Sequence, residues 1–267
     1  MLDYVSEHSD WAPPPRASEP LNVRALAHRQ RKQPGESAVL KKLGGIAQLS
    51  ETECALIGRM SVYRESISAG GSLWRPGQTV GARIILKGWA CRERTLPDGR
   101  RQIFGFLMPG DTIGLNLTSS PLEELSTVAL TRIDCMDALL LREILQTNDN
   151  RHARLQEALR VVQRDEEACL LDHIMRLGRQ SALERTAHFF LEIRQRTQAA
   201  GLADGESIPL PVTQEVLADA LGLSIVHLNR TLQSMKRDGL IEMRSGGLRI
   251  VDLQRLEAVG VYGRHDH

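Results

Sequence analysis

The sequence lacks several features that mark special classes of protein. Its 267 residues include only four cysteines and 4% aromatic residues, and the formal net charge is +1. No apolar run approaches the roughly 18–20 residues of a membrane span, and the first residues have neither the basic nor the apolar region of a signal peptide. With 42% hydrophobic residues, the chain is not collagen-like, wholly disordered or strongly polybasic. We therefore expect a soluble cytoplasmic protein with no membrane partner.

The cysteines do not follow a metal-binding pattern. Cys54, Cys91, Cys135 and Cys169 are separated by 37, 44 and 34 positions and form no C-x-x-C pair, which argues against zinc fingers and ferredoxin-type clusters. We predict no metal site. Two interpretations stay open. The cysteines are buried small hydrophobic side chains that stay reduced, or one of them is a redox-sensing thiol.

The length predicts about two domains. Residues 1–36 hold five of the 11 prolines and show no sustained apolar period, which predicts a mostly disordered N-terminal arm. Ser50 and Glu53 have the spacing of a capping box, so a short helix should follow and end near Met60.

From Ser61 to Leu141, short β-type runs alternate with turn residues such as Arg75-Pro76-Gly77 and Pro97-Asp98-Gly99. This pattern predicts an antiparallel sandwich or roll of about 80 residues, within a domain spanning 37–149. The stretch contains no histidine, which counts heavily against a metal-dependent roll enzyme of the cupin type. We do not expect an enzyme.

A helical period returns in residues 150–178, with the steps of three and four residues that a helix needs to pair with a copy of itself. Glu166 and His173 interrupt the apolar side. They mark the register or a contact to the roll, or the helix simply has one imperfect face. The predicted dimer contacts are Leu155, Leu159, Val162 and Cys169, and Leu170, Ile174 and Leu177 continue the apolar side.

Residues 179–260 carry the most informative pattern. Ser181 can cap a helix that runs to about Gln198, and a loop with a short strand follows. Thr213 and Ser224 can cap two further helices, between which Gly222 allows a tight turn. Gly239 then ends the second helix before a hairpin with a glycine turn, so the segment predicts a winged helix-turn-helix. The residues expected on the buried side of its second helix are Leu228, Leu232 and Met235.

Charge and side-chain chemistry point to DNA. Between Arg230 and Arg249 there are five basic and two acidic residues, a local excess of +3 in a nearly neutral chain. Arg230 suits guanine, Asn229 adenine and Val226 a thymine methyl group, so we expect these three residues to read base edges. The residues expected to contact phosphates are Thr213, Gln214, Ser224, His227, Thr231, Gln233, Lys236 and Arg244.

In the order roll, long helix and winged helix, residues 40–255 resemble the bacterial Crp/Fnr superfamily of transcription regulators. The most specific stretches are VTQEVLADALGLSIVHLNRTLQ and FLMPGDTIGL. The resemblance implies an α+β fold with a jelly-roll, cyclic-nucleotide-binding-like N-terminal domain, a dimerisation helix and a C-terminal winged helix-turn-helix. It also implies a homodimer that binds a near-palindromic site in double-stranded DNA and contacts RNA polymerase. The residues at the position of a polymerase-contacting loop are Asp204 and Glu206.

The sequence also departs from this superfamily. Members that bind cyclic nucleotides carry G-E-L followed by R-S-A, whereas the matching stretches here are Gly114-Leu115-Asn116-Leu117 and Glu124-Leu125-Ser126-Thr127, without the ribose-holding Glu or the phosphate-holding Arg. The N-terminal cysteines of the iron–sulfur branch are missing from residues 1–50, and the roll has no histidine for a haem. Val226 stands in place of the Glu that is common in the recognition helix of this superfamily, so the usual half-site is not expected. The pattern Val226-His227-Leu228-Asn229-Arg230 resembles the branch with V-H-x-N-R at this place. We therefore expect no cofactor.

Three ways of control stay open at this point. The leading interpretation is a regulator without a small-molecule effector, which binds DNA in proportion to its amount. The second is a regulator whose roll binds an unidentified hydrophobic or acidic molecule. The third is a redox-sensing regulator, for which Cys169 is the first choice because it lies on the predicted dimer contact, where oxidation would insert a polar group.

Overall fold

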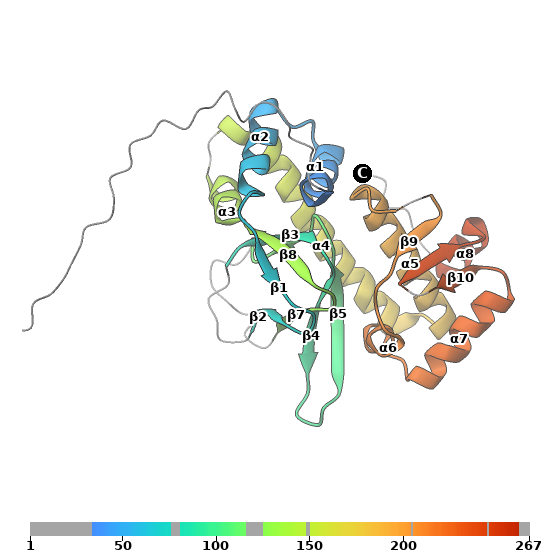
Figure 1. The fold of residues 1–267 in the computed structure, drawn as a ribbon. Coiled ribbons are helices and arrows are strands. Elements are labelled where there is room, and N and C mark those ends of the chain that lie inside the picture. The colour runs from blue at the N-terminus through green and yellow to red at the C-terminus, as the bar shows by residue number, and fades with distance from the viewer. Residues whose placement is uncertain are drawn as a thin grey trace, which may run out of the picture. The chain divides into compact units, whose positions relative to one another are not determined.

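The computed structural model describes residues 34–75, 81–115, 125–147, 150–203, 205–244 and 246–261. It confirms the predicted α+β architecture, in which an antiparallel roll is followed by a long helix and a winged helix-turn-helix (Figure 1). Within these ranges, no helix is both long enough and apolar enough to cross a bilayer.

The described part of the roll contains eight short strands. They are β1 (Glu65–Ile67), β2 (Ser72–Trp74), β3 (Arg83–Lys87), β4 (Ala90–Thr95), β5 (Arg101–Leu107), β6 (Thr112–Ile113), β7 (Ser126–Ala129) and β8 (Ile133–Asp137). The described pairings are antiparallel and form two four-stranded sheets, in the orders β1-β8-β3-β6 and β2-β7-β4-β5. Inward-facing side chains such as Ile85, Leu107 and Ile133 are buried between the sheets. This packing confirms the strand pattern read from the sequence.

Two of the four cysteines are buried in the roll. Burial is the main cause that raises the pKa of the Cys91 thiol to about 12 and that of Cys135 to about 11. These two fit the interpretation of cysteine as a small hydrophobic side chain, whereas Cys54 and Cys169 are partly exposed. In the part of the chain that the structure describes, no three His, Cys, Asp or Glu side chains are grouped to hold a metal ion.

Three helices pack on one end of the roll: α1 (Pro34–Ile46), α2 (Glu51–Met60) and α3 (Leu139–Gln146). The predicted capping box is present at α2. The Ser50 hydroxyl accepts a hydrogen bond from the Glu53 amide at 3.3 Å, and the Glu53 carboxylate accepts one from the Ser50 amide at 2.8 Å. The backbone amides of Ser50 and Glu53 at the start of the helix therefore both have hydrogen-bond partners, and the helix begins where the sequence predicts.

Helix α1 was not predicted. The arm was expected to run to residue 36, but a helix begins at Pro34, and Val39 and Leu43 on it are buried against the roll. Tertiary packing stabilises a segment whose helical propensity is lowered by Gly44 and Gly45. The rest of the predicted arm, residues 1–33, lies outside the described residues.

The long helix α4 (Ala153–Arg179) follows a short turn, η1 (Asn150–His152). Three of the predicted dimer contacts, Leu155, Leu159 and Val162, are 0–1% exposed because they pack in the core formed with the roll and the N-terminal helices. They are therefore not available to a second copy, and this part of the prediction is wrong. An apolar period marks a face that is covered, but it does not tell what covers it.

The C-terminal part begins with α5 (Ala182–Ala199), capped by Ser181 as predicted. It continues with β9 (Ser207–Pro209), α6 (Gln214–Leu221), α7 (Ile225–Arg237), β10 (Ile241–Arg244), β11 (Gly247–Ile250) and α8 (Leu253–Gly260). The strands form a three-stranded antiparallel sheet in the order β10-β11-β9. Because the roll, α4 and these elements belong to one compact unit of residues 33–267, the domain boundaries at 149 and 178 stay predictions.

Candidate nucleic-acid interface

Two capped helices and one glycine form the helix-turn-helix. The Thr213 hydroxyl accepts a hydrogen bond from the Val216 amide, and the Ser224 hydroxyl accepts one from the His227 amide, both at 3.2 Å. These bonds satisfy first-turn amides of α6 and α7, as the sequence predicted. Each hydroxyl keeps its hydrogen for a further acceptor, such as a DNA phosphate.

Gly222 makes the turn between the two helices. Its φ of 62° lies in the left-handed region, which a residue with a Cβ adopts only at a cost. A Cβ at this position would also lie 2.9 Å from Cδ2 of Leu177 in α4. Glycine is therefore required for the turn, and its missing side chain leaves room for the Leu177 side chain of α4.

Helix α7 has two distinct faces. Leu228, Leu232 and Met235 are at most 2% exposed and form the buried face, as predicted. Val226 is 61% exposed and Arg230 is exposed on the other face, with Asn229 half-buried beside them. The three residues expected to read bases thus lie where a groove of DNA can reach them.

The residues expected to contact phosphates are exposed, with one exception. Thr231 is only 7% exposed, and its hydroxyl donates to the backbone carbonyl of His227 at 3.0 Å. It stands three residues after Leu228 and four before Met235, on the buried face, so we remove it from the set. The exposed members are Thr213, Gln214, Ser224, His227, Gln233, Lys236 and Arg244.

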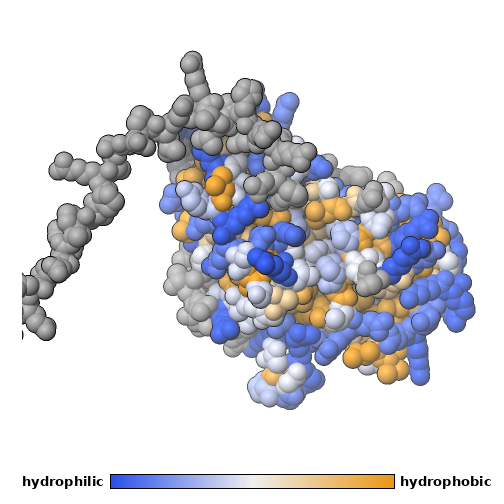
Figure 2. All heavy atoms as spheres, viewed as in Figure 1, coloured by the Kyte–Doolittle hydropathy of each residue, from blue (hydrophilic) through white to orange (hydrophobic). Residues whose placement is uncertain are grey.

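Part of the positive charge near α7 is already paired. Arg249 of the wing lies 3.4 Å from Glu206 and 3.5 Å from Glu242. Arg230, Lys236 and Arg244 are exposed, and hydrophilic side chains cover much of the molecule on the right of Figure 2, where α7 and α8 lie in Figure 1. The charge available to a polyanion is therefore concentrated on α7 and at Arg244.

One exposed residue of α7 was missed in the sequence. Ile225 is 46% exposed and directly precedes Val226. Its spacing of three residues to Leu228 and seven to Leu232 would place it on the buried side of α7, but at the first position of the helix it is only partly covered. Together with Val226 it gives the start of α7 an apolar surface.

The second half of α4 carries the exposed apolar residues of that helix. Leu170 and Ile174 are 41% and 64% exposed, and Leu171 and Met175 are 58% and 56% exposed. The members of each pair are four residues apart and share one side of the helix. We call these four residues the α4 stripe. Such a contiguous apolar surface is typical of a contact with another protein surface.

Glu166 and His173 contact the roll, which was one of the open alternatives. The Glu166 carboxylate accepts hydrogen bonds from Arg92 at 3.3 Å and from the Thr112 hydroxyl at 2.9 Å. His173 is buried, and its Nε2 lies 3.5 Å from Nε2 of Gln102 in β5. Burial lowers the pKa of His173 to about 4, and the Arg176 cation adds to the effect.

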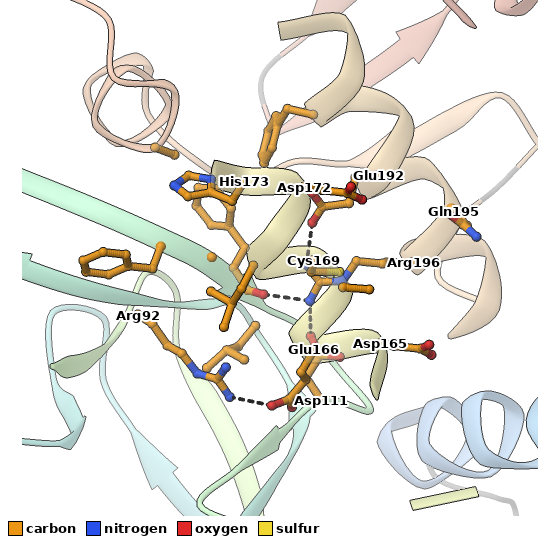
Figure 3. A pocket seen from close by; sticks show the side chains of 18 of the residues that line it. Arg92, Asp111, Asp165, Glu166, Cys169, Asp172, His173, Glu192, Gln195 and Arg196 are labelled. Carbon is orange, nitrogen blue, oxygen red and sulfur yellow. Dashed lines mark hydrogen bonds and ion pairs between the residues drawn. The ribbon is translucent and has the colours of Figure 1, made fainter. Parts of the chain in front are cut away.

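A chain of buried ion pairs joins the roll to α4 and α5 (Figure 3). Arg176 of α4 donates to Glu192 of α5, which accepts from Arg196 at 3.0 Å, and Arg196 donates to Asp111 at 2.7 Å. Lys42 of α1 lies 2.5 Å from the other Asp111 oxygen. Burial raises the pKa of Asp111, but the cations of Lys42 and Arg196 outweigh it and lower the value to about 2.

Cys169 lies beside this chain of ion pairs and is partly exposed, and its place at a dimer contact stays a prediction. It lines a cavity of about 170 Å³ together with Arg196 and Phe106 (Figure 3). Burial, with the Glu192 carboxylate adding to it, raises the pKa of the Cys169 thiol to about 12. Because the thiolate is the oxidisable form, this environment argues against Cys169 as a redox sensor.

Comparison with known proteins places these features in one family. The profile described as a Crp-like helix-turn-helix domain matches residues 184–259, and the profile described as a cyclic nucleotide-binding domain matches residues 64–147. The nitrogen fixation regulation protein FixK of Bradyrhizobium diazoefficiens is 32% identical over 176 residues, which cover 66% of this chain and 72% of that protein. The chain belongs to the Crp/Fnr family.

Two further relatives support the assignment. The transcriptional activatory protein AadR of Rhodopseudomonas palustris is 31% identical over 179 residues, 66% of this chain and 71% of that protein. The structure of FixK2 from Bradyrhizobium japonicum has a TM-score of 0.63 and 24% identity, and covers 76% of this chain and 98% of that one, which shows the shared fold. The protein is thus a DNA-binding transcription regulator of the Crp/Fnr family.

The roll of this Crp/Fnr protein has a hollow against α4. Arg92, Phe104, Leu115 and Thr127 are among the residues that line it, and Arg160 comes from α4. Asn116 and Glu124, two of the departures from the cyclic-nucleotide pattern, lie outside the described residues. A hollow at this place keeps the ligand-gated alternative open.

The predicted polymerase contact is only partly described. Glu206 is exposed and pairs with Arg249 of the wing, whereas Asp204 lies outside the described residues. Glu206 therefore lies beside the wing sheet, since β9 begins at the next residue.

Proposed function

We propose that the protein is a homodimeric, sequence-specific regulator that binds a near-palindromic site in double-stranded DNA. The observation that carries this proposal is the two-faced helix α7, which buries Leu228 and Leu232 and exposes Val226 and Arg230. Surface helices often expose polar side chains, but here the exposed face belongs to the second helix of a helix-turn-helix with a wing beside it, which is the element that such folds place in the major groove.

The α4 stripe is the proposed dimer contact, in place of Leu155, Leu159 and Val162. Its four residues are apolar, exposed and grouped on one side of a long helix. Pairing this stripe with the same stripe of a second copy gives a two-fold contact that hides it from water. Two copies then present two α7 helices, which read two half-sites about 34 Å apart when they lie one turn of DNA from each other.

The proposed reading of DNA follows the exposed chemistry of α7. Arg230 donates two hydrogen bonds to guanine, Asn229 pairs with adenine, and Val226 contacts a thymine methyl group. Phosphates are held by the exposed residues of the corrected set, above all Lys236 and Arg244. The half-site is set by these side chains, since Val226 stands where many relatives have Glu.

Activation is the proposed outcome of binding. Curated relatives include the transcriptional activator protein FnrL of Cereibacter sphaeroides, which is 26% identical over 200 residues. The proposed contact with RNA polymerase is the loop of Asp204 and Glu206. We place the protein in the cytoplasm, as a regulator and not an enzyme, and without a cofactor or a dependence on cyclic nucleotides.

A second candidate is a regulator gated by a small molecule in the roll. The hollow lined by Phe104 and Arg160 favours it, because it offers an aromatic ring beside a basic side chain, while Arg92 in the same hollow is already paired with Glu166. Operator titrations with and without cyclic AMP test gating by this one ligand. A gain of tenfold or more in affinity, about 1.4 kcal/mol of coupling, would favour gating.

Selection of bound sequences from a random DNA pool tests the proposal as a whole. The full-length protein should enrich an inverted repeat whose half-sites are about 10 base pairs apart, centre to centre. Enrichment of a single unrepeated motif would contradict the dimer, and no enrichment at all would contradict sequence-specific binding.

A further inference from the structure

Residues of the β4–β5 hairpin bind one residue of helix α6, Asp219. Arg101 donates from Nε to Oδ2 of Asp219 at 2.8 Å, and its Nη2 lies 2.7 Å from the same oxygen. The side-chain amide of Gln102 donates from Nε2 to the backbone carbonyl of Asp219 at 3.0 Å. Glu93 of β4 lies 3.2 Å from Nη1 of Arg101 and fixes the guanidinium. One residue of the helix-turn-helix is thus bound through both its side chain and its main chain.

The contact does nothing for the helix-turn-helix itself. Helix α6 is built on its cap at Thr213, on the turn at Gly222 and on buried side chains such as Leu217. Asp219 takes no part in these interactions, and its partner Arg101 is 118 positions away in the roll. The contact therefore acts between the helix-turn-helix and the roll, beside the apolar core that Ile103 of β5 shares with Ala220 of α6.

We propose that Arg101, Gln102 and Asp219 position the helix-turn-helix for binding to two half-sites at once. This inference rests on the proposed dimer. Only Gly222, Leu223 and Ser224 separate α6 from α7, so a contact that fixes α6 also fixes α7. Two copies whose α7 helices are fixed in advance lose less freedom when they bind an operator, which raises affinity without any new contact to DNA.

The exposure of α7 argues for positioning and against inhibition. With the Arg101–Asp219 contact formed, Val226, Arg230 and Lys236 remain exposed. The roll hairpin therefore covers none of the surface that is proposed to read DNA. A contact that blocked binding would have to bury part of it.

The buried ion-pair chain also connects the roll to the C-terminal part, and its carboxylates are more deeply buried than Arg101 and Asp219. The side chains of Asp111 and Glu192 in the buried ion-pair chain are 6% and 10% exposed, so removing one partner there leaves an uncompensated buried charge and threatens the fold. Arg101 and Asp219 are each 27% exposed, so water can solvate either one when the other is removed. The positioning contact can therefore be removed without unfolding the protein.

The test compares variants of the full-length protein on the operator found by selection. Arg101→Ala removes one such contact from each copy, and we expect the dimer to bind the operator about tenfold more weakly. The matched control is Arg100→Ala, which removes the same charge from the same hairpin, but at a side chain that is 77% exposed and pairs with Asp98. The control should bind within about twofold of the parent.

Half-site spacing gives a readout that a purely structural role would not move. Operators with the half-sites one base pair closer or farther apart should bind the parent much more weakly than the native spacing. For Arg101→Ala and Asp219→Asn this preference should shrink, while affinity for a single half-site stays unchanged.

Three results would overturn the inference. Parent-like affinity and spacing preference of Arg101→Ala would show that the contact is irrelevant. Tighter binding would make it inhibitory, and an equal loss on operator and single half-site would mean that α7 itself was damaged. A parent protein that is monomeric or selects no inverted repeat would instead contradict the proposed function, before any variant is compared.

Discussion

In the first half of α4, Leu155, Leu159 and Val162 are covered by the chain's own roll, whereas in the second half Leu170, Ile174 and Met175 are 41–64% exposed. Both halves contain apolar residues four positions apart, such as Leu155 and Leu159 in the first half and Leu170 and Ile174 in the second. The difference shows that the period identifies the apolar side of a helix, and that the partner is decided by what the rest of the chain places against it. Helix α7 repeats the contrast, with Leu232 turned inward and Arg230 outward.

The largest expected effect is on the covered half. Leu159→Ala should lower the free energy of unfolding by about 2–5 kcal/mol, because the Leu159 side chain is fully buried and its removal leaves a cavity. Ile174→Ala, the matched change on the exposed half, should cost less than about 1 kcal/mol in a monomer. Urea unfolding of both variants measures the two values. Similar losses would mean that the halves do not differ.

The next effect is on the outward face of α7. Arg230→Ala should weaken operator binding by about 1–3 kcal/mol and relax the preference for one guanine in each half-site, since a bidentate contact is lost. Fluorescence anisotropy on a panel of mutated operators measures both. The melting temperature should stay at the parent value, because Arg230 is exposed. Unchanged specificity would remove Arg230 from the base-reading residues.

A smaller and less selective effect is expected from Lys236→Ala. Loss of one phosphate contact should weaken binding to all sequences alike and lower the salt slope by about 1. Titrations at several salt concentrations, with Arg230→Ala as the comparison, separate the two roles. If both variants change specificity in the same way, the division between reading and phosphate-contacting residues fails.

The smallest effect is expected from Cys169→Ser. Because burial raises the pKa of the thiol to about 12, peroxide should change operator affinity equally little in the parent and in the variant. Parallel titrations after peroxide treatment check this. A loss of binding in the parent that Cys169→Ser prevents would restore the redox-sensing interpretation.

Local signals in the sequence predicted most of the elements. The capping box of Ser50, the caps at Thr213 and Ser224 and the turn at Gly222 each depend on a few adjacent residues, so one chain is enough to read them. The roll followed from turns between short alternating runs. The buried place of Thr231 was readable too, from its distance to Leu228, but its polar side chain favoured the wrong assignment.

Long-range pairing explains what the sequence did not predict. Helix α1 is stabilised by residues far along the chain, since Lys42 meets Asp111 across 69 positions. Arg101 and Asp219 are 118 positions apart, and neither lies in a pattern that names its partner. The covering of Leu159 by the roll belongs to the same class, because only the folded chain brings the two together.

Sedimentation equilibrium of the parent and of Ile174→Glu tests the central claim most directly. The account predicts that the parent is a dimer at micromolar concentration and that Ile174→Glu is a folded monomer. The variant stays folded because the new charge lies in the α4 stripe and not in the core. A monomeric parent, or a variant that remains as dimeric as the parent, would contradict it.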